Sequence, residues 1–413
     1  MTSKWYWLLS QMTRKLWFRT SLFAILAVIT ALISIVFKSF MPPALSGLVG
    51  TDAVDKILGI LASSMLAVTT FSLNIMVSAY NAASSSVTPR ATRLLVEDPT
   101  TQNVLATFIG SFLYSLVGII ALSMGAYGKE GRVVLFFVTL VVIILIIITL
   151  LRWIQHLAQF GQLGETTQRV EDATRRTFLD RLHNPLSGAS EWREQVLSAE
   201  NATPFYLKDV GYIQHIDMQS LSDHANEKAL LIFIARQPGE FIHPAEPLLW
   251  ISPAQAEVDT ELLISSFTVR PQRSFDQDPR FGFCVLSEIA SRALSPAVND
   301  PGTAIDVIGR GVRLLSHWPS VSERDSSVHY PRLYIRPLKP AELFDDLFTG
   351  IARDGAGMIE VQIALQKALK ALAAINPSVF AVPAKEHRLQ AMERAGHALQ
   401  SDYDRRRLSQ FQE

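Results

Sequence analysis

The chain has 413 residues, of which 49% are hydrophobic, and its 38 lysines and arginines balance 38 aspartates and glutamates. A formal net charge of zero gives no general basic signal for nucleic acid, so nucleic-acid binding is not expected. The single cysteine, Cys284, excludes an internal disulfide and any metal site built from several cysteines.

The first 17 residues mix aromatic and basic side chains. They include Trp5, Tyr6, Trp7 and Trp17 together with Lys4, Arg14 and Lys15. Tryptophan and tyrosine favour the headgroup layer of a membrane, and lysine and arginine favour its anionic inner surface. Residues 1–17 are therefore interpreted as an interfacial amphipathic leader, with simple anchoring of the chain as the alternative to any further role.

The hydrophobic residues concentrate in four runs before Arg152. The runs cover residues 18–37, 58–80, 104–127 and 133–151, and each approaches the roughly 20 residues that a helix needs to cross a bilayer. Residues 18–152 are therefore predicted to form a transmembrane domain of four helices. The alternative for the first run is a signal peptide cleaved near Ala44 or Ser46, but three further spans follow it.

Lysines and arginines beside the runs predict the orientation of the chain. The start of the first run, the loop between the second and third runs and the segment after the fourth run carry basic residues. These are Arg19, Arg90, Arg93, Arg152 and Arg169, in addition to the basic residues of the leader. The opposite loops hold only Lys38, Lys56, Lys129 and Arg132. Positively charged flanks stay inside, so both termini are expected in the bacterial cytoplasm, with the helices in the cytoplasmic (inner) membrane.

The second run carries one small or polar residue per helical turn. These residues are Ser63, Ala67, Thr70, Asn74, Ser78, Asn81 and Ser85. Steps of three and four place all seven side chains on one face of an α-helix, at the depth of the membrane. Unsatisfied polar groups cost free energy in hydrocarbon, so this polar stripe must face another helix or water.

Three interpretations of the polar stripe stay open. If it lines water, several copies of the chain must gather round one path, whose lining would be Ser63, Thr70, Asn74, Ser78, Asn81 and Ser85. Arg90 and Arg93 would lie at the mouth of that path, where nearby acidic residues leave the sign of selectivity undetermined. If the stripe packs within the chain, the third run offers Ser111, Ser115 and Gly118 as a matching surface. The third interpretation is a pocket for a small molecule.

Beyond Arg152 the pattern of the chain changes. Helical periodicity continues to about Pro185 and predicts a helical connector over residues 153–204, with no stop signal at Arg152-Trp153. Gly161 and Gly164 would weaken this helix and are candidates for a bend. Short apolar segments separated by proline and glycine predict a small α+β module over residues 205–255. Amphipathic patterns predict a mainly helical domain over residues 256–413. The expected fold class is a membrane α-helical domain with a cytoplasmic α+β domain.

Three stretches of the chain carry a family resemblance. They are residues 86–114, beginning Ser86-Val87-Thr88-Pro89-Arg90; residues 211–225, beginning Gly211-Tyr212-Ile213; and residues 278–304, which contain Arg292-Ala293-Leu294-Ser295-Pro296-Ala297-Val298-Asn299-Asp300-Pro301. With these motifs the chain resembles the bacterial predicted membrane proteins catalogued as domain of unknown function 2254. The resemblance implies several membrane spans plus a cytoplasmic domain, and it transfers no activity.

The third of these stretches predicts a structured turn between two helices. Pro296 cannot continue a helix, and Asp300 can cap a helix that begins at Pro301. A rigid, capped turn explains these residue types without chemistry. The alternative is that Arg292, Asn299 and Asp300 form a cytoplasmic polar site or a contact between subunits.

The sequence contains no pattern that indicates catalysis. Walker, dinucleotide, nucleophile-elbow, zinc-protease and kinase motifs are absent. His215 and Asp217 lie near Asp223 and His224, which invites a metal site, but the last two are adjacent on a predicted helix and diverge by about 100°. No enzyme activity, metal or cofactor is therefore expected.

Two functions of different classes follow from these patterns. The first is a homo-oligomeric membrane channel or channel-like conduit for ions or small solutes, with the second membrane helix lining the path and a cytoplasmic regulatory domain. The second is a membrane-anchored sensor or scaffold whose cytoplasmic module binds a ligand or protein partner. The lipid bilayer is an expected partner in both.

Overall fold

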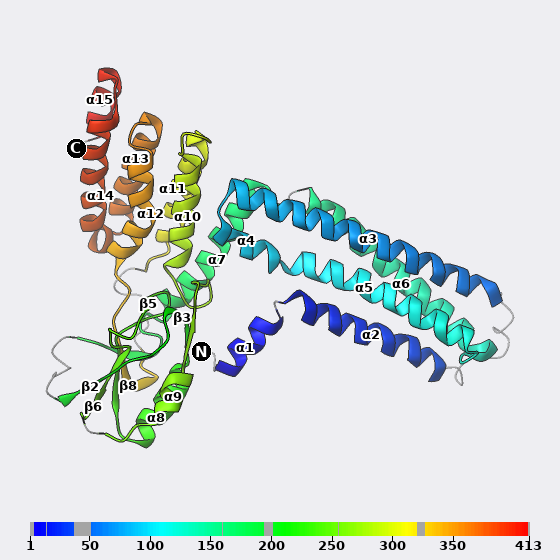
Figure 1. Ribbon diagram of the computed structural model, residues 1–413. Coiled ribbons are helices and arrows are strands. Elements are labelled where there is room, and N and C mark those ends of the chain that lie inside the picture. The colour runs from blue at the N-terminus through cyan, green and yellow to red at the C-terminus, as the bar shows by residue number, and fades with distance from the viewer. Residues whose placement is uncertain are drawn as a thin grey trace. The chain divides into compact units, whose positions relative to one another are not determined.

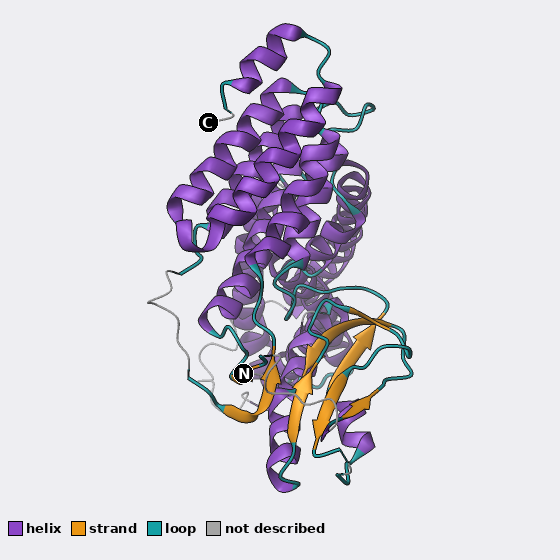
Figure 2. Cartoon of the chain, turned by 90° about the vertical axis from the view of Figure 1, so that its left-hand side faces the viewer, coloured by secondary structure: helices purple, strands orange, loops and turns teal. Residues whose placement is uncertain are grey.

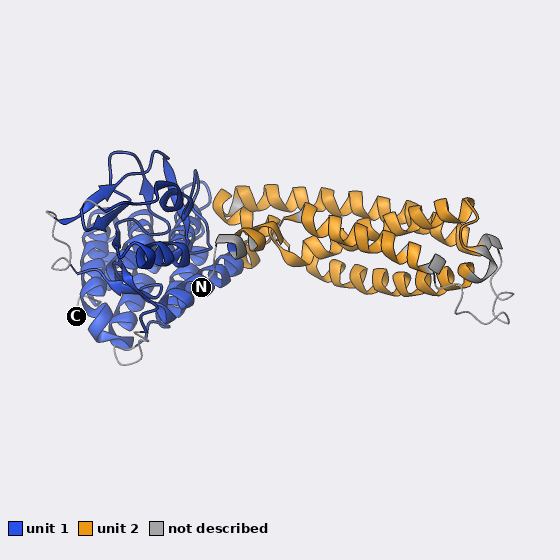
Figure 3. Cartoon of the chain, turned by 90° about the horizontal axis from the view of Figure 1, so that it is seen from below, with its two compact units in different colours: residues 1–7, 167–413 blue, residues 8–166 orange. Residues whose placement is uncertain are grey.

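The computed structural model describes residues 4–13, 15–36, 51–158, 160–193, 201–254, 256–319 and 327–411. Arg14, Phe37, Lys38, Ala44 and Ser46, on which parts of the sequence predictions rest, lie outside the described residues. The chain forms two compact units, which Figure 3 shows in different colours. One is the apolar unit, Leu8–Thr166, and the other is the C-terminal unit, Thr167–Glu413 together with Met1–Trp7.

The apolar unit is built from helices (Figure 1). The helices are α1 (Lys4–Thr13), whose first residues belong to the other unit, α2 (Leu16–Val36), α3 (Thr51–Ser86), α4 (Pro89–Val96), α5 (Pro99–Ser123) and α6 (Gly128–Leu157). Within the described residues, three segments are long and apolar enough to cross a membrane, namely Ala53–Ser85, Pro99–Ser123 and Gly131–Leu157. The second, third and fourth apolar runs therefore form helices of membrane-spanning length, while α2 contains a shorter apolar stretch, Trp17–Thr30.

Helix α5 is the centre of the apolar unit, because it contacts α2, α3 and α6. A glycine lets α5 approach α2 closely: a Cβ atom at Gly110 would lie 3.3 Å from the backbone oxygen of Phe23. The hydroxyl oxygen of Tyr114 lies 3.0 Å from Thr139 Oγ1 of α6, so each polar group finds a partner inside the bundle. Small and hydroxyl-bearing residues thus mark the surfaces that pack within this unit.

The helix continues past Arg152 and Trp153 as predicted, but it is not continuous to His183. Helix α6 ends at Leu157, and a separate helix, α7, extends over Leu163–His183. Gly161 lies between them with φ +80°, a conformation that glycine adopts at little cost. A Cβ atom at Gly161 would also lie 2.9 Å from the Cβ atom of Ala79 in α3. The close approach and the backbone angle together explain why the helix stops there.

The C-terminal unit contains two small sheets (Figure 2). Its strands are β1 (Ala189–Glu191), β2 (Thr203–Phe205), β3 (Gly211–Ile216), β4 (Leu231–Ile234), β5 (Phe241–Ile242), β6 (Leu249–Ser252), β7 (Phe267–Arg270) and β8 (Tyr330–Ile335). One sheet has the order β1-β8-β4-β6-β2 and the other the order β5-β3-β7. β8 pairs in parallel with both β1 and β4, while the other pairs are antiparallel.

The strands are not confined to residues 205–255. β1 and β2 precede this segment or overlap its start, and β7 and β8 lie within the segment that the sequence describes as mainly helical. Helices α8 (Met218–Glu227) and α9 (Thr260–Ser265) also belong to this part of the unit. Both sheets and α8 share one apolar core, which includes Ile213, Leu221, Ile232, Leu249 and Leu333. Burial of these side chains is the main term that holds the sheets together.

Helices form the rest of the C-terminal unit. They are α10 (Phe281–Ala293), α11 (Pro301–Leu315), α12 (Pro340–Asp354), α13 (Ile359–Ile375), α14 (Pro377–Ala398) and α15 (Asp402–Ser409). Figure 1 shows α10 to α14 side by side, and α10 contacts α11 and α12 while α13 contacts α11 and α14. A buried carboxylate ties α7 to α11: Glu171 accepts hydrogen bonds from Arg310 Nη1 at 2.6 Å and Arg313 Nε at 2.9 Å.

Candidate functional site

The polar stripe lies on helix α3, and the structure exposes every one of its side chains. Ser63, Ala67, Thr70, Asn74, Ser78, Asn81 and Ser85 are all exposed. Large apolar residues flank the stripe, and Phe71 and Val77 expose 63% and 58% of their surface. None of the described segments of this chain covers the stripe. Packing of the stripe within the chain is therefore wrong for the described residues.

The buried face of α3 lies opposite the stripe. Leu58, Leu61, Met65 and Ser72 are buried, and at about 100° per residue they fall roughly 140° to 180° round the helix from Asn74. The hydroxyl of Ser72 accepts a hydrogen bond from Trp153 Nε1 of α6 at 3.0 Å. The inner face of α3 thus makes a polar contact with α6, and the periodic stripe lies on the outer face.

The stripe residues differ in how their polar atoms are satisfied. Ser63, Thr70 and Ser85 donate their hydroxyl hydrogens to backbone carbonyls three or four residues earlier in α3. Such bonds to the same helix make a hydroxyl tolerable in an apolar medium. Asn74 and Asn81 have no hydrogen-bond partner in the described part of the chain. Their amide groups are therefore the part of the stripe that most requires an outside partner.

The two arginines expected at the mouth of a path differ in their surroundings. Both lie on α4, which Thr88 caps and Pro89 begins. Arg90 is exposed. Arg93 Nε donates to Glu97 Oε1 at 2.7 Å, so a carboxylate offsets its charge. Asp98 instead caps α5, where it accepts from the backbone N–H of Thr101 at 2.7 Å.

The turn between α10 and α11 has the structure that its residue types predict. Asp300 is the N-cap of α11, accepts a hydrogen bond from the backbone N–H of Thr303 at 3.1 Å, and precedes Pro301. Hydrogen bonds from the Thr303 hydroxyl and amide lower the pKa of Asp300. Asn299 has φ +51°, a left-handed conformation that asparagine tolerates better than most residues.

The three polar residues of this turn do not form one cluster. Among the described residues no hydrogen bond or ion pair joins Arg292 to Asn299 or Asp300, and the Arg292 Nε atom is buried without a partner. Asn299 lines a shallow hollow of about 670 Å³ with Ser291 and Asp354. The turn is thus a capped connection between α10 and α11, and its three polar side chains do not form a joint site.

The residues that invited a metal site have structural contacts instead. Asp217 caps α8 by accepting from the backbone N–H of Ser220 at 3.1 Å. His224 Nε2 accepts from the backbone N–H of Asp259 at 3.3 Å. Within the described ranges, no group of three or more histidine, cysteine, aspartate or glutamate side chains is placed to hold a metal ion.

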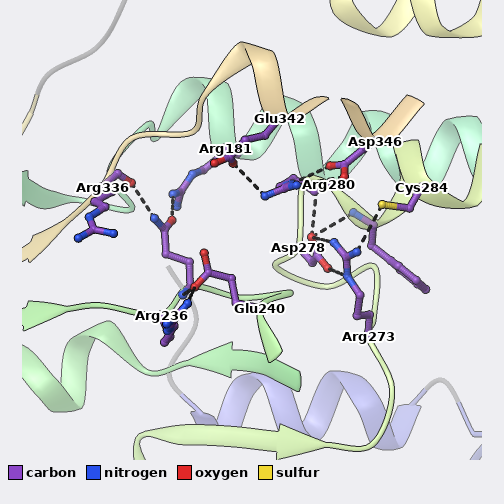
Figure 4. Close-up of polar contacts among 12 residues, drawn as sticks. Arg181, Arg236, Glu240, Arg273, Asp278, Arg280, Cys284, Arg336, Glu342 and Asp346 are labelled. Carbon is purple, nitrogen blue, oxygen red and sulfur yellow. Dashed lines mark hydrogen bonds and ion pairs between the residues drawn. The ribbon is translucent and has the colours of Figure 1, made fainter. Parts of the chain in front are cut away.

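A charged cluster at the start of α10 is a feature that the sequence did not single out as a site (Figure 4). Asp278 is buried and accepts from Arg273 Nε at 2.7 Å and from the backbone N–H groups of Arg280 and Phe281 at 3.0 Å. Burial raises the pKa of Asp278, although these bonds oppose the change. The only sequence signal was the Asp-Pro pair followed by Phe-Gly, which belongs to the third resembling stretch.

A neighbouring arginine continues this cluster. Arg280 Nε donates to Asp346 Oδ2 at 2.6 Å, and its Nη1 donates to Glu342 Oε2 at 2.9 Å. Burial alone would lower the pKa of Arg280, but its carboxylate partners hold the pKa above the ordinary value. The cluster therefore connects the start of α10 to α12 through charge-assisted hydrogen bonds.

The two units together define a membrane protein: apolar helices of spanning length are joined to a folded unit of strands and helices. The family described as "Predicted membrane protein (DUF2254)" matches residues 13–371, and the chain belongs to this family. Membership confirms the resemblance predicted from the sequence.

Curated relatives come from mycobacteria. They are Uncharacterized protein MT1328 and Uncharacterized protein Rv1290c of Mycobacterium tuberculosis, and Uncharacterized protein Mb1321c of Mycobacterium bovis. Each is 26% identical over 253 residues, which cover 58% of this chain and 47% of the relative. The chain thus spans about half the length of the curated relatives it matches. No solved structure gives a significant match.

Proposed function

We propose that this chain is a homo-oligomeric membrane channel or channel-like conduit, in which α3 of each subunit turns its polar stripe toward the centre of the assembly. The stripes then line a path for ions or small solutes. The observation that carries the proposal is the position of the stripe on the outer face of α3, opposite the face that packs within the apolar unit.

The physical argument concerns the two amides of the stripe. A polar group that faces hydrocarbon without a partner costs on the order of several kcal/mol. Asn74 and Asn81 have no partner in the described part of their own chain, and both lie on a helix of membrane-spanning length. Contact with other subunits or with water removes this cost. One helix cannot enclose water, so a hydrated path requires several copies.

The proposed topology adds a fourth span and an orientation. Helix α2 has 21 residues, and a helix of that length extends for about 30 Å, the thickness of the hydrocarbon core. Its outer face exposes Leu22, Ile25 and Leu26 by 57% to 58%. With four spans and the distribution of basic residues, both termini lie in the cytoplasm, and the C-terminal unit becomes a cytoplasmic regulatory domain at the inner membrane.

The charges at the proposed mouth favour an anion-tolerant entrance. Arg90 is exposed, and Arg93 forms an ion pair with Glu97. Asp98 is buried at the start of α5 and is 5% exposed, so it contributes little to the surface. Exposed arginine near a pore entrance attracts anions, particularly at low ionic strength.

A cross-linking experiment tests the oligomer. Cys284 is the only cysteine, so a Cys284→Ala background accepts one reporter thiol. In oxidised native membranes, Ser78→Cys is expected to form a disulfide between subunits. Leu73→Cys serves as the control, because it is exposed but lies about 100° round the helix from Asn74. Equal dimer yields at the two positions, or none at Ser78, would contradict the proposed arrangement.

A conductance measurement tests the path. Purified protein in planar bilayers should pass current, and Asn74→Leu should change its size or selectivity while the Ser78→Cys cross-link still forms in that variant. Leu73→Met is the matched control, since Leu73 is an exposed apolar residue of α3 that lies about 100° round the helix from Asn74. A complete absence of current over a range of voltage, tension and pH would exclude the conduit.

A second candidate function is a membrane-anchored sensor or scaffold whose C-terminal unit binds a ligand or a protein partner. A polar cavity of about 350 Å³ in that unit favours it. If Ser78→Cys cross-links the subunits but the purified protein carries no current, the second function is supported over the first.

A further inference from the structure

The cavity lies where four segments of the C-terminal unit meet. It is lined by the end of α7, the connection from β4 to β5, the connection from β7 to α10, and the connection from β8 to α12. Its volume is about 350 Å³, which suits a small metabolite. Figure 4 shows Arg181, Arg280 and Glu342 on one side of this region and Arg236 with Glu240 on another.

Basic side chains dominate the lining. Arg181, Arg236, Arg273, Arg280, Arg336 and Lys339 line the cavity, against only two carboxylates, Glu240 and Glu342. Burial raises the pKa of Glu240. The cavity is therefore a site of positive potential within a polar wall, the arrangement that attracts anions.

Carboxylates offset three of the six basic groups. Arg273 is paired with Asp278 at 2.7 Å and Arg280 with Asp346 at 2.6 Å, as described for the charged cluster. Arg236 pairs with Glu246 at 2.5 Å. For Arg181, Arg336 and Lys339, the described residues supply no carboxylate within 4.0 Å. Three positive charges around one cavity thus lack a negative partner from the described part of the chain.

Arg181 gives the sharpest indication of a missing ligand. Its Nη1 donates to Ser187 Oγ at 2.8 Å and its Nη2 donates to Gln237, both of which are neutral groups. The Nε atom is buried and has no hydrogen-bond partner among the described residues. Burial lowers the pKa of Arg181 to about 10. A half-buried guanidinium whose partners are all neutral is costly, and an anion in the cavity would offset that cost.

Arg336 is exposed, but one ring contact orients its side chain. The guanidinium of Arg336 lies 4.6 Å from the centre of the Trp192 ring, a contact that orients its plane. The backbone carbonyl of Arg336 accepts from Gln237 Nε2 at 2.9 Å, so the strand end and the β4–β5 connection are tied together. Gly239 in that connection has φ +92°, and a Cβ atom there would lie 2.2 Å from Asp278 Oδ2.

We propose that this cavity binds a soluble small molecule through a phosphate group, with Arg181, Arg336 and Lys339 as the groups that recognise it. A phosphate monoester carries a charge of about −1.5 to −2 at pH 7 and has three acceptor oxygens, which matches three unpaired cations better than one carboxylate does. Arginine forks suit phosphate oxygens in pairs, and lysine supplies a further charge. This binding is compatible with either candidate function and does not depend on conduction.

The test uses the full chain in a neutral detergent and measures pyrophosphate and inorganic phosphate binding by calorimetry at constant ionic strength. Pyrophosphate is expected to bind. The double variant Arg336→Ala with Lys339→Ala should weaken that binding by about tenfold or more, because two charge-assisted contacts are lost. Both side chains are exposed, so this variant should fold. Arg181→Gln should abolish binding.

A matched control removes the same charge elsewhere. Lys370→Ala with Arg407→Ala takes two exposed cations from α13 and α15, away from the cavity lining, and should bind pyrophosphate like the unmodified chain. The proposal is overturned if neither phosphate probe binds at millimolar concentration, or if the two double variants lose affinity equally. Binding of phosphatidic acid vesicles without binding of either soluble probe would assign the phosphate to a lipid and also overturn it.

Discussion

Replacing Gly282 by alanine tests how closely α10 and α7 approach in the C-terminal unit. A Cβ atom at Gly282 would lie 1.9 Å from Thr174 Oγ1 and 2.6 Å from Thr174 Cβ, whereas ordinary contacts are 3.4 Å or longer. Rotation of the threonine moves its Oγ1 atom but leaves its Cβ in place. The two helices must therefore separate by roughly 1 Å to accommodate the methyl group, which is a case of overpacking.

The expected cost of Gly282→Ala follows from this geometry. Overpacking typically costs about 1 to 3 kcal/mol, and a clash with an immobile Cβ atom belongs at the upper end. Alanine gains little helix propensity here, because Gly282 lies in the first turn of α10. A loss of about 2 to 3 kcal/mol should lower the thermal midpoint by about 4 to 12 °C, measured by tryptophan fluorescence of the full chain in detergent.

A second substitution makes the reasoning refutable. Thr174→Gly removes the opposing atoms at a helix-propensity cost of about 1 kcal/mol, so the double variant should melt higher than Gly282→Ala alone. Gly396→Ala is the control, because no atom lies within 4 Å of its Cβ position and the midpoint should stay or rise. A midpoint for Gly282→Ala within 1 °C of the unmodified chain, or purely additive losses in the double variant, would refute the close-approach argument.

Three further outcomes follow from single residues of the same unit. Glu171→Gln should cost about 2 to 4 kcal/mol of stability at pH 7; burial acts to raise the pKa of Glu171, but bonds from two arginines of α11 hold it below the ordinary value. That contribution is present above the unfolded pKa and is lost as pH falls through the folded pKa, so the thermal midpoints of the two proteins should converge as the pH falls below the ordinary range of a glutamate. Burial lowers the pKa of His387, so stability should fall as pH drops below about 6.5, and His387→Leu should flatten the pH profile between pH 8 and pH 5. Gly239→Ala should lower the free energy of unfolding by about 2 to 3 kcal/mol and weaken pyrophosphate binding, because the added methyl group would overlap Asp278. The thermal midpoint measures the first effect and calorimetry the second.

Local signals in the sequence predicted local structure well. Asp300 before α11 and Pro301 at its first position specify where that helix begins. Apolar residues recur at helical spacing in α13, and Val361, Leu365 and Leu372 on that face are buried. Each of these features depends on residues within a few positions of one another, so periodicity and capping chemistry are enough to find them.

Features that depend on distant segments were not predictable from pattern. Strand β1 is three residues long and pairs with β8, so Ala189 lies opposite Tyr330 across 141 positions of sequence. Nothing in a three-residue segment specifies such a partner. The break at Gly161 likewise depends on Ala79 in another helix. Tertiary contacts of this kind override a helical pattern that is locally continuous.

The candidate site also has one part that the sequence predicts and another part that depends on tertiary contacts. Helical spacing alone placed the seven stripe residues on one face of α3, but only the packing of the other helices determines that this face is the outer one. The cations of the cavity come from four segments between Arg181 and Lys339. No spacing rule joins them, because the sheets and α7 bring them together only in the folded chain.

The position of Asp278 has a thermodynamic consequence for the C-terminal unit. One carboxylate orients Arg273, holds the first backbone amides of α10, and lies against Gly239 in another wall of the cavity. Occupancy of the cavity and integrity of the α10 terminus therefore share a common element and must influence each other reciprocally. Any molecule that binds there should make the start of α10 exchange its amide hydrogens more slowly, and any change that loosens the start of α10 should weaken that molecule's affinity by the corresponding factor.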